Sequence, residues 1–297
     1  MKKKEKKIIA PNEASLGRWI AVLAVGYLLG QALALILLLC MHNMPEMIMG
    51  IRTNDMGIML SFVCCFVAMI FTIKVLGKTS LKEFVLGIGG KLNIKECLLV
   101  LGLFLAGYTL VVLPNLSYYR LRGVNAGEYI FLVVFMLLTA WTQTTWEELV
   151  FRGLVIRWAC KNDMRFTKKA LIAGIVSSVA FALCHAANPE VTSQSGLNVI
   201  VAVAAYAIPG IVFFLADLHF GNLMPSIVFH WINNFLLFTV FGTEGSAMPV
   251  PTLLVMPEVV ITAKGLFMGS TLVYLPLLAY ILFDVLRKKK TGAARNA

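Results

Sequence analysis

Apolar runs of about 20 residues recur along most of this chain, and they limit its possible folds more than any other feature. A run of this length matches the roughly 30 Å hydrocarbon core of a bilayer at 1.5 Å of rise per helical residue. The composition agrees, because 59% of the 297 residues are hydrophobic and only 14% are charged. We therefore expect an all-α, polytopic membrane helix bundle with no soluble domain.

Eight segments have the length and hydrophobicity of transmembrane helices. They cover residues 16–41, 56–77, 96–114, 129–158, 168–187, 197–218, 222–241 and 265–286. The first segment is too long for the apolar core of a signal peptide and lacks a small-residue cleavage site, so we expect it to remain as an anchor. An even number of spans places both termini on one side of the membrane.

The stretch 242–264 contains Pro249, Pro251 and Pro257 and is too broken for a ninth span. We interpret it as a loop on the outer membrane surface. A lid that dips into the bundle is the alternative.

The distribution of cations gives the orientation, because Lys and Arg concentrate in cytoplasmic flanks. The flanks on the side of the termini hold 21 of the 26 cations, and the opposite flanks hold Arg52, Arg120, Arg122 and Lys264. Arg152 lies inside a span. Both termini are therefore predicted to be cytoplasmic, in what we expect to be the cell membrane.

The formal charge of +11 also raises the possibility of a nucleic-acid partner. No basic stripe interleaved with aromatic residues lies outside the apolar runs, so we expect no nucleic-acid binding. The six cysteines fall within or at the ends of apolar segments and show no CxxC spacing. We interpret them as reduced packing residues.

Ionisable residues inside the predicted spans are the candidates for function, because burying a charge in a bilayer costs roughly 2.5–3.5 kcal/mol on insertion scales. The fourth span carries Glu147, Glu148 and Arg152, the fifth carries His185, and the seventh carries His230 with Asn233 and Asn234. Counting helical rise from the cytoplasmic ends places these groups about 12–27 Å deep, around the middle of the membrane. Asp217 and His219 lie at the cytoplasmic end of the sixth span, where we expect water nearby.

Spacing within the spans separates the roles of these groups. Glu148 and Arg152 are four residues apart and can pair on one helix face, whereas Glu147 is rotated about 100° away. Glu147 is therefore the unpaired carboxylate and the candidate general base. His230 and Asn234 are also four residues apart, and both can donate hydrogen bonds to an oxyanion.

Each of these residues also has an ordinary structural interpretation. A Glu–Arg pair can be purely structural, a buried histidine can bond a neighbouring carbonyl, and Asn often joins transmembrane helices. Their combination at compatible depths favours a functional site.

These residues resemble the motifs of the CAAX-protease and bacteriocin-processing membrane proteins, the CPBP or Abi family. Residues 147–153 read Glu-Glu-Leu-Val-Phe-Arg-Gly and fit the motif EExxxR with its usual FRG continuation. Phe181 and His185 fit FxxxH, and His230 with Asn234 fits HxxxN after a similar lead-in at 221–226. The resemblance covers residues 129–241, which makes this segment the catalytic core. Residues 1–128 then supply helices 1–3, and 242–297 supply the outer loop, helix 8 and the basic tail.

The resemblance implies an intramembrane endopeptidase in which Glu147 and His185 activate water and His230 with Asn234 stabilises the oxyanion. Glu148 and Arg152 would support this site, or Arg152 would bind a substrate carboxylate. The implied partners are the lipid bilayer and a peptide or protein substrate, either lipid-anchored or a secreted-peptide precursor.

The family leaves the metal question open, because both a metalloprotease and a metal-free glutamate mechanism have been proposed for it. A carboxylate and two histidines are enough for a catalytic zinc, so Glu147, His185 and His230 are the ligand set if zinc is bound. Neither HExxH nor HxxEH is present in the sequence. We favour a site without a metal cofactor and keep zinc as the alternative.

Two other functional classes remain open. The first is a catalytically silent membrane scaffold or bacteriocin-immunity protein, against which the full set of motif residues argues. The second is a proton-coupled transporter, since Glu, His and Arg can form a relay, but no inverted repeat is visible in the sequence. The absence of GxSG and GxGD motifs argues against the serine and aspartate types of intramembrane protease.

Overall fold

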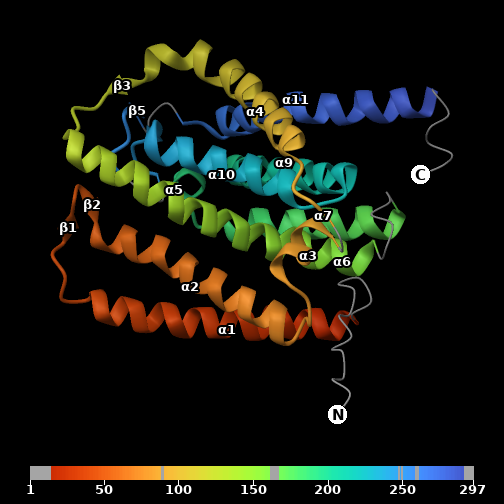
Figure 1. Ribbon diagram of the computed structural model, residues 1–297. Coiled ribbons are helices and arrows are strands. Elements are labelled where there is room, and N and C mark those ends of the chain that lie inside the picture. The colour runs from red at the N-terminus through yellow and green to blue at the C-terminus, as the bar shows by residue number, and fades with distance from the viewer. Residues whose placement is uncertain are drawn as a thin grey trace.

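The computed structural model describes residues 15–87, 90–160, 167–246, 248, 250–257 and 261–290. Its long helices form an elongated bundle, with short strands gathered at one end (Figure 1). The Lys-rich stretch at 2–7 and Lys161, Arg165, Pro249 and Arg295 lie outside the described residues.

All eight predicted transmembrane segments are helical. The helices are α1 (Leu16–Met41), α2 (Thr53–Val75), α4 (Ile94–Asn115), α5 (Ala126–Glu148), α7 (Lys168–Cys184), α9 (Leu197–Phe220), α10 (Met224–Thr239) and α11 (Ala263–Lys290). The fourth span runs on from α5 through a π-helical turn, η3 (Leu149–Gly153), into α6 (Leu154–Ala159).

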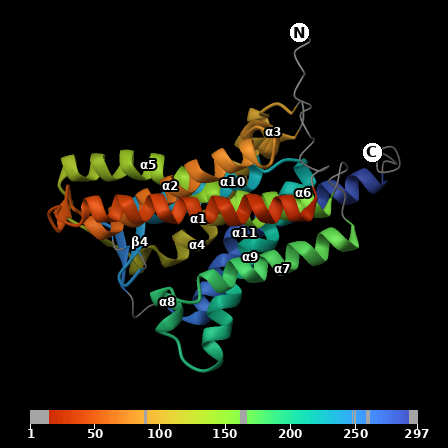
Figure 2. The ribbon, with the colours of Figure 1, turned by 90° about the horizontal axis from the view of Figure 1, so that it is seen from below.

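Six helices in the described part of the chain are long and apolar enough to cross a membrane. The other two predicted spans are shorter, with 17 residues in α7 and 16 in α10. The integral, multi-pass helix bundle is therefore confirmed, while the count of eight spans and the side on which the termini lie stay predictions. In Figures 1 and 2 the start of α1 and the end of α11 lie at the same end of the bundle, opposite the strands.

Short elements connect the long helices. They are α3 (Leu81–Leu86), α8 (Pro189–Thr192) and the 3-10 turn η2 (Leu116–Tyr118). Ser80 and Glu83 form a capping box at the start of α3. Arg157 of α6 donates through Nε and Nη2 to the Phe84 carbonyl, at 3.1 and 2.5 Å, and so ties α3 to the bundle.

The strands form two small sheets, of which the first is antiparallel and the second is mixed. β1 (Met47–Ile48) and β2 (Ile51–Arg52) make an antiparallel hairpin between α1 and α2. β5 (Leu254–Met256) lies between β3 (Arg120–Leu121), which is antiparallel to it, and β4 (Phe241–Thr243), which is parallel to it.

The prediction of a plain surface loop for 242–264 is therefore wrong in part. The segment adds β5 and the end of β4 to a sheet, and it also reaches into the bundle. Met248 and Val250 are buried in a cluster with Met59, Met136 and other residues of α2 and α5. The reason is the apolar character of the residues between the prolines, which gain more by burial than by contact with water. As predicted, the segment does not form a ninth span among its described residues.

An aromatic cluster joins α4, α9, α10 and α11 beside the polar residues. Phe229 contacts Phe104 edge-to-face, with ring centroids 4.8 Å apart, and stacks on Tyr274 at 5.0 Å. Phe213 contacts both Phe229 and Tyr274. Because Phe229 directly precedes His230, this cluster helps to set the rotation of α10 about its axis.

Close helix packing depends on small residues, as is usual in membranes. A Cβ added at Gly107 of α4 would lie 2.0 Å from the carbonyl oxygen of Val273 on α11. A Cβ at Gly102, also on α4, would meet no atom within 4 Å.

We predict that Gly107→Ala destabilises the protein by about 1–3 kcal/mol, because the added methyl group forces α4 and α11 apart. The matched control Gly102→Ala should be neutral or slightly stabilising, since alanine favours helix. Thermal unfolding of the purified protein in detergent measures both. Equal stability of the two variants would show that α4 and α11 do not approach as described.

Candidate active site

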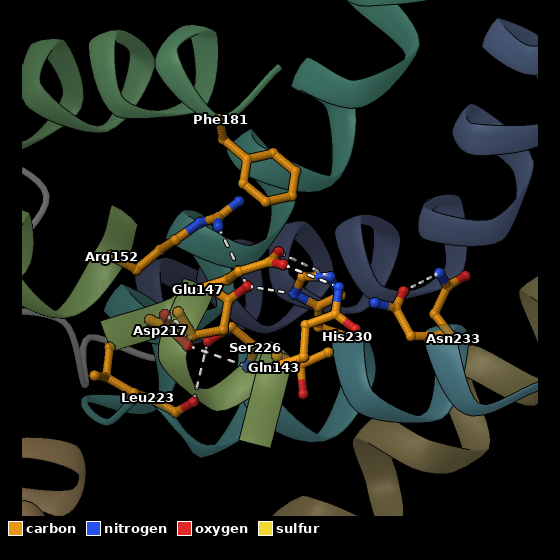
Figure 3. Close-up of polar contacts among 12 residues, drawn as sticks. Gln143, Glu147, Arg152, Phe181, Asp217, Leu223, Ser226, His230 and Asn233 are labelled. Atoms are coloured by element: carbon orange, nitrogen blue, oxygen red, sulfur yellow. Dashed lines mark hydrogen bonds and ion pairs between the residues drawn. The ribbon is translucent and has the colours of Figure 1, made fainter. Parts of the chain in front are cut away.

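Four charged or ionisable side chains meet inside the bundle: Glu147 and Glu148 at the end of α5, Arg152 in η3, and His230 in α10 (Figure 3). All four are buried, with exposed fractions of 6%, 0%, 1% and 6% in that order. Burying an unpaired charge in a protein interior lowers the stability of the fold, so these four groups must be stabilised by pairing with one another.

Glu148 is the centre of this cluster. Its Oε1 accepts a hydrogen bond from Arg152 Nη1 at 3.2 Å and one from His230 Nδ1 at 2.7 Å. The predicted pairing of Glu148 with Arg152 is confirmed. The bond to His230 adds a link between the fourth span and α10.

Glu147 has a different environment. Gln143, one helical turn earlier on α5, donates from Nε2 to Glu147 Oε1 at 3.1 Å. His230 Nε2 lies 3.6 Å from Glu147 Oε2, which is too long for a normal hydrogen bond. Glu147 Oε2 and Glu148 Oε2 are both buried without a hydrogen-bond partner, and of the two it is Glu147 Oε2 that faces His230 Nε2. This oxygen is free to accept a hydrogen bond.

The π-helical turn η3 coincides with the motif residues Leu149 to Gly153. Such turns are rare and often occur at functional sites. Ser177 of α7 donates its hydroxyl to the Phe151 carbonyl in this turn, which satisfies a backbone group and joins α7 to the fourth span. A Cβ at Gly153 would lie 2.5 Å from the Phe84 ring, so the glycine lets α3 approach this turn.

Arg152 is surrounded by aromatic rings. The carbon of its guanidinium lies 4.4 Å from the centroid of Phe181 and 5.5 Å from that of Phe213. These faces favour a cation and offset part of its desolvation. The Nη2 group of Arg152 is buried without a hydrogen-bond partner.

The expectation that water surrounds Asp217 and His219 is wrong. Asp217 is fully buried and accepts from the backbone N–H and the hydroxyl of Ser226, at 3.2 and 2.8 Å. His219 Nε2 lies 3.3 Å from Asp284 of α11, and both side chains are 6% exposed. The sequence places these residues near a helix end, but α10 and α11 cover that end.

Asp217 has a clear structural role. Its two hydrogen bonds to Ser226 hold the first turn of α10, where free backbone N–H groups attract a carboxylate. His230 follows Ser226 by one helical turn on the same face. The contact between α9 and α10 therefore helps to place His230 against the two glutamates.

In the part of the chain that the structure describes, no hydrogen bond or ion pair joins His185 to Glu147. Its Nδ1 lies 2.8 Å from the Phe181 carbonyl, and its ring stacks on Tyr206. The Phe181 ring contacts both the His185 ring, at 4.6 Å, and the His230 ring, at 5.9 Å. The structure thus places His230, rather than His185, next to Glu147.

Asn234 lies one turn beyond His230 on α10. Its Oδ1 accepts from Asn233 Nδ2 at 3.2 Å, which leaves the amide group of Asn234 as a donor. In Figure 3, Asn233 lies farther along α10 from the glutamates than His230 does.

The zinc alternative requires Glu147, His185 and His230 around one ion. Among the residues that the structure describes, no three side chains of His, Cys, Asp or Glu are grouped so that they could hold a metal. The Nδ1 atoms of His185 and His230 bond a carbonyl and a carboxylate, which leaves Nε2 of each ring for other contacts, as is usual for histidines that bind a metal. These bonds are therefore compatible with either mechanism. The six cysteines, at positions 40, 64, 65, 97, 160 and 184, are free thiols.

Comparison with known proteins agrees with the motif analysis. Residues 129–236 match the family model described as Rce1-like, type II CAAX prenyl endopeptidase. The resemblance to the CAAX-protease family is confirmed. The Rce1-like segment contains the charged cluster, His185 and Asn234, and the family that it matches is one of membrane-embedded proteases.

Part of the chain is also similar to a curated protein. Over 130 residues the chain is 28% identical to the uncharacterized protein YyaK of Bacillus subtilis strain 168. The alignment covers 44% of this chain and 40% of the relative, so the chain spans less than half the length of the relative that it matches.

Sequence reasoning missed several residues of the site. Gln143, Ser226 and Tyr206 are uncharged, and nothing in the apolar pattern distinguishes them from residues that face lipid or join helices. Gln143 carried one usable signal, because it precedes Glu147 by one helical turn and a side-chain amide is rare in a span.

We predict that Arg152→Ala destabilises the protein by about 3–5 kcal/mol, because it leaves Glu148 with a single partner in a buried site. The double variant Glu148→Gln/Arg152→Gln should recover part of this loss. The control Arg287→Ala should cost less than about 1 kcal/mol, because that side chain is 62% exposed and Lys288 also pairs with Asp284.

Thermal unfolding in detergent measures these differences. An Arg152→Ala variant as stable as the wild type would contradict the pairing and would favour a role for Arg152 in binding a substrate carboxylate.

Proposed function

We propose that this protein is an intramembrane endopeptidase that hydrolyses a peptide bond in a membrane-associated peptide or protein. The observation that supports this proposal best is the buried carboxylate oxygen Glu147 Oε2, which has no hydrogen-bond partner and faces His230 inside an Rce1-like segment. The family description extends the proposal to a lipid-anchored substrate cut near its C-terminus. A secreted-peptide precursor is the other substrate class that fits the chemistry.

Glu147 is the general base in this proposal. It takes a proton from water as the water oxygen attacks the carbonyl carbon of the substrate, and it later returns the proton to the leaving amine. Gln143 holds one carboxylate oxygen through a hydrogen bond, which orients the other toward the reacting water. From the family resemblance we assign the second hydrogen bond of this water to His185, and because no direct contact joins its ring to Glu147, the water lies between the two side chains in this proposal.

The oxyanion is assigned to His230 and Asn234. Glu148 accepts from His230 Nδ1 and so fixes the ring, whose Nε2 is directed to the region beside Glu147. Because Nδ1–H is donated to Glu148, Nε2 can donate only from a doubly protonated ring, so His230 is an imidazolium in this proposal. A donor there lies close to where charge develops on the substrate oxygen. Glu148 and Arg152 support the site by holding this ring.

Glu147→Gln and His185→Ala are predicted to abolish cleavage without unfolding the protein, because each removes one partner of the reacting water. Membrane peptides are compared between a strain lacking this protein and the same strain complemented with wild type or with a variant. At least one peptide terminus should depend on the wild type and be absent with either variant.

Glu128→Gln is the matched control, because it removes a carboxylate from the first turn of the same helix α5. It should restore the wild-type peptides. Peptide patterns that are identical in all strains would contradict the proposal and favour the scaffold or immunity alternative.

A second prediction concerns metal. We propose that catalysis does not require zinc, so the purified protein should hold less than one zinc per chain by elemental analysis. Cleavage should also persist in the presence of a chelator. One zinc per chain that is lost in His185→Ala and in His230→Ala would contradict this prediction and would make these histidines ligands.

A further inference from the structure

A second polar cluster contacts the His185 ring through Tyr206. The proposed mechanism does not use this cluster. It consists of Asn188, Glu190 and Tyr206, which come from the start of α8 and the middle of α9. Tyr206 donates its hydroxyl to Glu190 Oε1, and Asn188 Nδ2 lies 3.2 Å from both Glu190 Oε1 and Tyr206 Oη. The three side chains therefore hold one another.

The cluster is also anchored to the rest of the bundle. Gln194 donates to the Glu190 carbonyl at 3.3 Å, and it accepts from the backbone N–H of Ala263 at the start of α11. Val191, next to Glu190, is fully buried with Ala202 and Ala263. These contacts connect α8, α9 and α11 and limit the freedom of Tyr206.

The Tyr206 ring is stacked on the His185 imidazole, with centroids 4.5 Å apart and an angle of 19° between the planes. On the edge of the imidazole, Nδ1 faces the Phe181 carbonyl. A carbonyl oxygen only accepts hydrogen bonds, so Nδ1 carries the hydrogen and Nε2 of the neutral ring keeps its lone pair. A half-turn of the ring would put Cδ2 in place of Nδ1 at this carbonyl and move Nε2 to the position of Cε1.

We propose that Tyr206, Glu190 and Asn188 form a clamp that holds His185 in one ring orientation, with Nε2 presented as the acceptor. The clamp residues are positioning residues, because they act through His185 rather than on the substrate. This inference rests on the proposed function for the role of His185, but the orientation of the ring can be measured without any substrate.

The direct test is the tautomer of His185 in the full-length protein, purified in lipid nanodiscs and labelled with 15N-histidine. Long-range 1H–15N correlation spectra distinguish a ring protonated at Nδ1 from one protonated at Nε2. The chain has four histidines, and the His185→Gln variant assigns the signal. We expect a single Nδ1–H form in the wild type and a mixture of both forms in Tyr206→Leu.

Kinetics test the consequence, with a fluorogenic peptide that carries a farnesylated cysteine and an apolar three-residue C-terminus as the probe. Tyr206→Leu should lower kcat about tenfold, because misplacing a catalytic group by about 1 Å is enough for a loss of this size. Its KM should change less than about twofold, since the clamp does not touch the substrate. Tyr206→Phe keeps the stacked ring but loses the hydrogen bonds to Glu190 and Asn188, so it should give a smaller loss of kcat than Tyr206→Leu.

Tyr280→Leu is the matched control, because Tyr280 stacks on Phe220 away from His185. It should leave the His185 signal and kcat unchanged, while the His219 signal can shift because Tyr280 also contacts that ring. Glu190→Ala serves as a second variant if Tyr206→Leu does not fold, and it should give a smaller change in the same direction.

An unchanged His185 spectrum in Tyr206→Leu or Glu190→Ala would overturn the clamp. An altered His185 spectrum in Tyr206→Leu with an unchanged kcat would also overturn the proposal. If the wild type does not cleave the probe, the prenylated substrate class fails, while the spectra still decide whether the clamp exists.

Discussion

The Glu148 carboxylate is the constraint on which the rest of the site depends. It is fully buried, and it accepts from Arg152 in the same helical span and from His230 in α10. A carboxylate in a low-dielectric interior must keep such partners, so the rotation of both helices about their axes is restricted. The aromatic contacts of Phe229 and the hydrogen bonds of Asp217 to Ser226 support the same placement of α10.

The two adjacent glutamates differ because their partners differ. Glu148 has an Arg and a His, and its charge is neutralised within the protein. Glu147 has only a neutral amide as hydrogen-bond partner, while Oε2 of each glutamate is buried without one. This asymmetry separates a structural carboxylate from one available for proton transfer, and it follows from the 100° that separates consecutive residues of a helix.

The sequence predicted the helix bundle and part of the charged cluster. Hydropathy located all eight helical segments, because a bilayer allows few alternatives to long apolar helices. The spacing of Glu148 and Arg152 predicted their pairing. Spacing within one helix could not predict that His230 would bond Glu148, because this contact depends on how α10 docks against the fourth span.

Features that depend on tertiary packing could not be predicted from the sequence. The π-helical turn at 149–153 has no composition signal, and the burial of Asp217 depends on α10 and α11 covering it. The segment 242–264 appeared to be a loop because its prolines exclude a helix, yet its apolar residues form a strand and enter the core. The clamp at His185 involves Tyr206, which is an ordinary aromatic residue in an apolar run.

A double-mutant cycle between Glu148 and His230 tests the central claim most directly. Glu148→Met and His230→Phe, alone and combined, remove the bond while keeping similar volumes, and reversible unfolding in detergent gives the free energies. A bond between α5 and α10 predicts a coupling free energy above about 1 kcal/mol, within the range of about 0.5–3 kcal/mol for residues in contact. Additivity within about 0.3–0.5 kcal/mol would contradict the account, because it would show that the two side chains do not interact.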